Sequence, residues 1–101
     1  MAREVGADKA IAQILESLAV FAVRRKEMAR ALTLSSAAEA LRARNSIPRP
    51  PIFSAEQDRC IAEARGALTA AEADRAIDLG RAMDIAAALA AATTDGELNN
   101  D

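Results

Sequence analysis

The sequence contains no histidine, tryptophan or tyrosine, and it has one cysteine and two phenylalanines. These absences remove the side chains that most often bind transition metals, act as general bases near neutral pH, or stack on nucleic-acid bases. The four glycines are far apart, so there is no glycine-rich phosphate loop. We therefore expect no enzymatic activity, no bound metal and no cofactor.

Long apolar runs are also missing. No segment approaches the roughly 20 apolar residues that cross a bilayer, and Met1 to Val5 lacks the pattern of a signal peptide. We expect a cytoplasmic protein without a membrane segment. The single Cys60 cannot form an intrachain disulfide; it is either a small buried apolar residue or a nucleophile without an activating base.

Charge of one sign does not dominate, because the formal net charge is only −2. The two halves differ, however: residues 1–50 sum to +4 and residues 51–101 to −6. A uniformly basic nucleic-acid binder would not show this division. The pattern fits either solvated helix faces of unlike sign or head-to-tail association between the basic half of one copy and the acidic half of another.

Bulky apolar side chains are few. Of the 52 apolar residues among 101, 27 are alanine, which contributes a single methyl group each. A chain of this length forms one small domain that buries about 60–65% of its unfolded surface. We expect marginal stability for the monomer and a surface that contacts a partner.

What the sequence does have is apolar residues at three- and four-residue steps, which predict an all-α fold of about five helices. One domain, 1–92, is expected: an antiparallel hairpin (8–44), a proline-rich connector (45–53) and a three-helix cap (54–92), followed by a disordered acidic tail (93–101). The expected helices span 8–23, 27–44, 55–67, 70–79 and 85–92. Capping residues are assigned at the start of four helices and the end of one: Asp8 as the N-cap of the first helix, Ser54 and Thr69 in capping boxes, Asp84 as an N-cap, and Gly80 as a left-handed C-terminal residue.

Each expected helix has an apolar side. In the first helix this side consists of Ile11, Ile14, Leu15, Leu18, Phe21 and Ala22, and in the second of Met28, Ala31, Leu32, Ser35, Ala38 and Leu41. The second set is mostly small, which allows close approach of a neighbouring helix. In the later helices the apolar residues are Cys60, Ile61, Ala64 and Leu68, then Ala73, Ala76 and Ile77, and then Ile85, Ala88 and Leu89.

Two stretches are similar to a known family. The segment Ser36-Ala37-Ala38-Glu39-Ala40-Leu41-Arg42, followed by the proline-rich connector, and the later Gly80-Arg81-Ala82-Met83 segment resemble the C-terminal end of large actinobacterial regulators. Those regulators join an ATPase module to tetratricopeptide-like helices, with a LuxR-type DNA-binding domain or an adenylate cyclase domain. The first two expected helices also resemble one tetratricopeptide repeat, through Leu15, Leu18, Ala19, Ala22, Ala31 and Ala38. The resemblance implies a scaffold part of a transcriptional regulator, since the ATPase, cyclase and DNA-binding elements are not in these residues.

The sequence thus predicts a non-catalytic helical module for protein–protein interaction or self-association, in a transcriptional-regulator context. Its expected interaction face is Ile14, Leu15, Leu18, Phe21, Met28, Leu32 and Ile61. The alternative is a small nucleic-acid-associated regulator, in which Arg24, Arg25, Lys26 and Arg30 contact phosphates near Arg42 and Arg44. We regard nucleic acid as the less favoured partner, because Glu27 and Glu39 dilute the basic patch and no aromatic residues interleave it.

Overall fold

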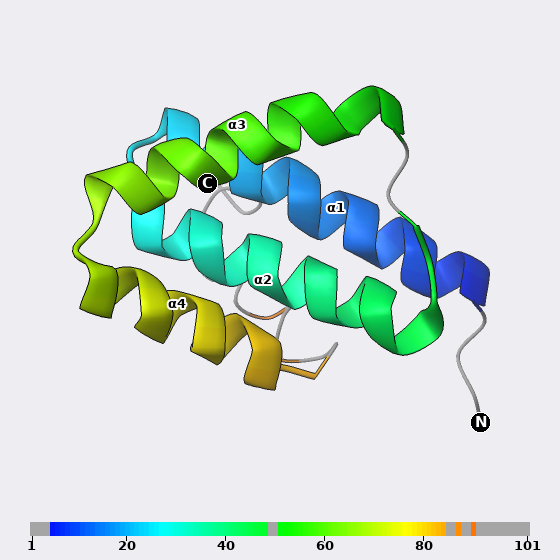
Figure 1. The fold of residues 1–101 in the computed structure, drawn as a ribbon. Coiled ribbons are helices and arrows are strands. Elements are labelled where there is room, and N and C mark those ends of the chain that lie inside the picture. The colour runs from blue at the N-terminus through cyan, green and yellow to red at the C-terminus, as the bar shows by residue number, and fades with distance from the viewer. Residues whose placement is uncertain (1–4, 49–50, 85–86, 88–89, 91–101) are drawn as a thin grey trace, which may run out of the picture.

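The computed structural model describes residues 5–48, 51–84, 87 and 90, and within them it contains four α-helices and no strand (Figure 1). The helices are α1 (Val5–Arg24), α2 (Met28–Asn45), α3 (Pro51–Ala67) and α4 (Ala70–Ala82). The expected all-α class is confirmed. The fifth expected helix (85–92) lies for the most part outside the described residues, and the expected tail (93–101) lies wholly outside them. The capping contact of Asp84 is present, since its Oδ1 accepts a hydrogen bond of 2.7 Å from the backbone N–H of Ala87.

The second helix is the centre of the fold. It runs antiparallel to α1, lies between α1 and α4 in Figure 1, and packs against all three other helices. Helix α3 also packs against α1, whereas α3 and α4 make at most marginal contact within the described residues. These two helices meet only near the turn that joins them and diverge from there (Figure 1).

Both hairpin helices end in a left-handed residue that is not glycine. At the end of α1, Lys26 has φ 67° and its N–H donates to the Val23 carbonyl (3.0 Å), while the N–H of Glu27 donates to the Ala22 carbonyl (2.8 Å). This pair of bonds is a Schellman motif, which reverses the chain in a short turn. Ser46, with φ 55°, ends α2 in the same way.

Small residues let α2 and α4 approach closely. Thr33 Oγ1 donates to the Ala76 carbonyl (3.2 Å), and Ser36 Oγ donates to the Ile77 carbonyl (2.6 Å), so side chains of α2 bond directly to the backbone of α4. Gly80 is buried at this contact, and a Cβ there would lie only 2.7 Å from the Cβ of Ser36. The expectation that Gly80 ends its helix in a left-handed conformation was wrong: α4 continues to Ala82, and Gly80 lies inside it, where the absence of a side chain allows the close approach of α2.

The expected N-cap at Asp8 is wrong, since α1 begins at Val5 and Asp8 lies within its first turn. Of the two expected capping boxes, one is confirmed. Thr69 Oγ1 accepts from the Glu72 N–H (3.1 Å), and Glu72 Oε1 accepts from the Thr69 N–H (2.9 Å). The box at Ser54 is wrong, since α3 already begins at Pro51 and Ser54 lies inside the helix. Proline is favoured in the first helical turn, where its missing N–H would have no intrahelical partner, so the connector is shorter than expected.

The core consists of two adjoining clusters of small and aliphatic side chains. One joins α1 to α2, and the other joins α1 and α2 to α3 and α4. In α1 the buried stripe is shifted from the expected one, because Ala12, Leu15, Ala19, Ala22 and Val23 face the core. The expected core residues Ala73 and Ala76 of α4 are buried as predicted, and Ile77 is partly buried.

Candidate binding groove and interaction surfaces

The residues of the predicted interaction face lie at different depths. Ile14 and Phe21, two turns apart on α1, are 49% and 44% exposed. The others face inward: Leu15 and Leu32 are buried, and Leu18, Met28 and Ile61 are partly buried against the core clusters. The exposed part of the predicted face is therefore a short apolar stripe on α1.

The predicted phosphate contacts, Arg24, Arg25, Lys26 and Arg30, lie at the turn between α1 and α2 and on the first turn of α2. Three of them form ion pairs with carboxylates. Arg24 lies 3.3 Å from Glu56 of α3, and Glu27 lies 3.7 Å from Arg25 and 3.9 Å from Arg30. Arg25 also lies over the ring of Phe21, 5.7 Å from its centroid. These contacts neutralise much of the patch within the chain itself.

A buried ion pair connects the two helices of the hairpin, and sequence reasoning did not find it. Arg42 Nε and Nη2 donate to the two carboxylate oxygens of Glu16 at 2.7 and 2.9 Å, and Arg42 Nη1 donates to the Pro48 carbonyl at 2.8 Å. The two side chains are only 5% and 12% exposed. Bidentate arginine–carboxylate pairs of this kind fix geometry as well as charge. Arg42 is therefore a structural residue of the core and not part of the basic surface.

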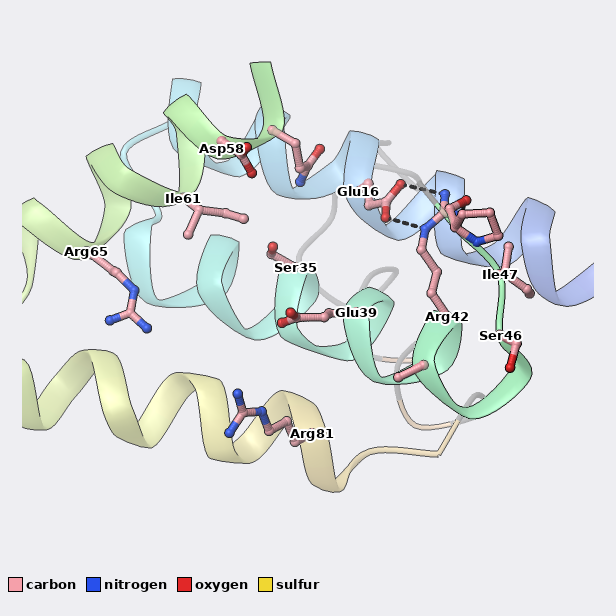
Figure 2. Close-up of a pocket in the computed structure, with 13 residues that line it drawn as sticks. Glu16, Ser35, Glu39, Arg42, Ser46, Ile47, Asp58, Ile61, Arg65 and Arg81 are labelled. Carbon is pink, nitrogen blue, oxygen red and sulfur yellow. Dashed lines mark hydrogen bonds and ion pairs between the residues drawn. The ribbon is translucent and has the colours of Figure 1, made fainter. Parts of the chain in front are cut away.

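A groove of about 840 Å³ lies where α3 and α4 diverge, and α2 forms its floor (Figure 2). Figure 2 shows Arg65 of α3 and Arg81 of α4 entering it from opposite walls, with Ser35 and Glu39 of α2 between them. Ile61 supplies an apolar patch to the α3 wall. This volume is in the range that small-molecule sites occupy.

Several polar groups in the groove have no partner within the described residues. The Nε2 of Gln57 is buried without a hydrogen bond, in a side chain that is 6% exposed. Neither guanidinium, of Arg65 or of Arg81, has an ion pair or hydrogen bond in this part of the chain, and the same holds for the Glu39 carboxylate and the Ser35 hydroxyl. Arg65, Arg81 and Glu39 are exposed to solvent, whereas the buried Nε2 of Gln57 is an unsatisfied polar group of a kind that is rare in folded proteins and calls for an explanation.

A second hollow, of about 670 Å³, runs along the other side of α3, where this helix borders α1. Ile14, Ser17 and Val20 of α1 line one wall, and Glu56 and Gln57 of α3 line the other. Ile14 of the exposed stripe therefore borders a concave surface, whereas Phe21 lies outside it.

Among the described residues there is no cluster of His, Cys, Asp or Glu that could hold a metal ion. Cys60 is half-buried, and burial, with a further contribution from the nearby Glu56 and Glu63 carboxylates, raises the pKa of its thiol above the ordinary value. This environment suppresses the thiolate, which is the reactive form of cysteine.

Three comparisons with known proteins give no match: neither a family model, nor a curated protein, nor a solved structure is similar enough to this chain to be counted. In the part of the chain that the structure describes, no helix has the length and apolar character needed to span a bilayer.

Proposed function

We propose that this chain is a non-catalytic protein–protein interaction module that associates head to tail with further copies of itself, in the cytoplasm and in a transcriptional-regulator context. The α1–α2 hairpin would serve as the tetratricopeptide-like part of the module. The observation that carries the proposal is the exposed pair Ile14 and Phe21 on one stripe of α1. Exposed apolar side chains gathered on one face favour contact with another protein.

A second copy is the occupant that the charges favour. Residues 5–45 sum to +3 and residues 51–82 to −2, so the hairpin of one copy attracts the second half of another. Helix α4 offers an apolar counterpart, Leu79, which is 55% exposed. Glu72 lies two turns before Leu79 on the same face of α4, and it can face the exposed Arg25, which lies over the Phe21 ring of the other copy. The contact joins two different surfaces and can therefore repeat from copy to copy.

Sedimentation over a micromolar to millimolar concentration range tests the proposal. Replacing both α1 residues in an Ile14→Asp/Phe21→Asp variant should weaken association by about a hundredfold or more, because two apolar side chains lose their burial. Leu79→Asp should weaken it through the other surface. The control is Ala62→Asp at an exposed position of α3, which should change nothing. A wild-type chain that stays monomeric throughout the range would refute the proposal.

Mixing the two variants tests the head-to-tail geometry. The Ile14→Asp/Phe21→Asp chain keeps its α4 surface and the Leu79→Asp chain keeps its α1 surface, so together they should form a dimer that cannot extend. An interface that pairs like surfaces gives no such rescue.

A gel shift with salt titration should show at most weak binding to DNA, whereas tight binding that falls steeply with salt would favour phosphate contacts instead.

A further inference from the structure

We propose that the groove between α3 and α4 binds a small molecule with two carboxylates and one ammonium group, of which an acidic amino acid is the simplest example. The inference is independent of self-association, because it concerns the groove over α2 and not the exposed stripe of α1. It rests on the juxtaposition, in one concave site, of two guanidiniums, one carboxylate and one hydroxyl that have no partner within the described residues.

The two walls supply the positive charges. Arg65 and Arg81 come from helices that make at most marginal contact with each other, yet both side chains enter the same opening (Figure 2). No carboxylate pairs with either guanidinium among the described residues. A free guanidinium offers a planar fork of donors that matches a carboxylate, so each wall can hold one carboxylate of a ligand.

The floor supplies the negative charge. Glu39 lies one helical turn beyond Ser35 on the same face of α2, and Figure 2 shows its carboxylate in the opening between the two walls. An anion with no positive group would gain from the arginines but meet repulsion from Glu39. A ligand with an ammonium group positioned against Glu39 complements all three charges of the site.

Ser35 differs from the two nearby hydroxyl residues of α2, Thr33 and Ser36, in its hydrogen bonding. Thr33 and Ser36 each donate a hydrogen bond to a carbonyl of α4 and hold the two helices together. Ser35 is just 9% exposed, has no partner in the described chain, and directs its Oγ into the groove (Figure 2). This hydroxyl is therefore available to bond to a ligand in the groove.

The remaining polar groups at the groove do not compete for the ligand's charges. Glu16 and Arg42 neutralise each other in the buried bidentate pair, and Asp58 at the α3 wall has an interaction within the chain. The buried Gln57 amide borders the same space, and rotation about its last torsion can turn its unpaired N–H towards a carboxylate.

Titration of the wild-type chain with L-glutamate, followed by backbone amide NMR, tests the site. Saturable shifts should concentrate on the groove residues of α2, α3 and α4. L-glutamine, which lacks one carboxylate, and glutarate, which lacks the ammonium, should each bind about tenfold more weakly or worse. Inorganic phosphate should bind no better than glutarate.

Substitutions in the groove give matched controls. Arg65→Gln and Arg81→Gln should each weaken L-glutamate binding about tenfold or more, whereas Arg59→Gln and Arg75→Gln, on exposed parts of the same two helices outside the groove, should leave it unchanged. Ser35→Ala should weaken binding without lowering the free energy of unfolding, since the Ser35 hydroxyl makes no hydrogen bond within residues 5–48 and 51–84.

The variant Glu39→Gln gives the sharpest discrimination. It should weaken L-glutamate binding and strengthen glutarate binding, because the removed carboxylate attracts the ammonium of one ligand and repels the carboxylates of the other. No saturable shift with L-glutamate at millimolar concentration would overturn the proposal. Equal affinity of the wild-type chain for L-glutamate and glutarate would overturn the role of Glu39 and with it the ligand class.

Discussion

Replacement of Gly80 by alanine is the most direct test of how α2 and α4 are held together. The added Cβ would lie 2.7 Å from the Cβ of Ser36 and 3.0 Å from the backbone nitrogen of Ala37, and closer still to the carbonyl oxygen of Thr33. Two of these neighbours are backbone atoms and cannot turn away. The two helices must therefore separate, which strains the hydrogen bonds from Thr33 and Ser36 to α4.

The magnitude follows from three contributions. Alanine is the better helix former by about 1 kcal/mol. Overpacking costs about 1–3 kcal/mol, and two weakened hydrogen bonds cost about 0.5–1.5 kcal/mol each. We expect Gly80→Ala to lower the free energy of unfolding by about 2–3 kcal/mol, measured by urea denaturation with circular dichroism because the chain has no tryptophan. The matched control, Gly66→Ala on α3, has no atom within 4 Å of the new Cβ and should stabilise by about 0.5 kcal/mol. If both substitutions stabilise the protein, the close packing of α2 and α4 is refuted.

Three further predictions concern stability and reactivity. Removing either partner of the Glu16–Arg42 pair by alanine should cost about 3–5 kcal/mol, while the apolar double variant Glu16→Leu/Arg42→Met recovers most of that loss; a sum of two independent losses in the double variant would contradict the pairing. Thr69→Ala should lower the free energy of unfolding by about 1 kcal/mol through loss of the capping box, and no change would mean that the cap does not stabilise α4. Iodoacetamide should alkylate Cys60 more slowly in the folded than in the unfolded chain, because folding raises the pKa of this thiol, and Glu56→Gln should accelerate the reaction. The free energy of unfolding that the neutral Cys60 thiol contributes should be fully present below the pKa of the unfolded chain and should be lost as the pH rises through the pKa of the folded chain.

The sequence was sufficient for the class of fold and for the elements that depend on local chemistry. The all-α class follows from apolar spacing, and the Thr69 box follows from a hydroxyl and a carboxylate three residues apart. The same local pattern failed at Ser54, because Pro51 begins α3 one turn earlier. A capping residue can be recognised from its neighbours, but the pattern alone does not exclude that an earlier residue has already started the helix.

Features that join distant parts of the chain were not predictable in this way. Gly80 was interpreted as a helix end, since the sequence gives no sign that α2 would pass within van der Waals contact of it. Glu16 and Arg42 are 26 residues apart, and neither is unusual in an amphipathic helix. The groove arises because α3 and α4 diverge, which is a matter of helix packing. The apolar stripe of α1 was misplaced for a related reason: alanines form much of its buried face and leave two larger residues, Ile14 and Phe21, on the surface.

The central position of α2 has a consequence for how the molecule opens. Its residues 31–38 are buried without interruption, because the other three helices surround this segment. We expect the amide hydrogens of this segment to exchange with solvent mainly through unfolding of the whole domain, and those of α3 to exchange through smaller openings as well. Cleavage in the connector between α2 and α3 would leave an N-terminal fragment in which α2 has lost two of its three neighbouring helices, so we expect that neither fragment folds on its own.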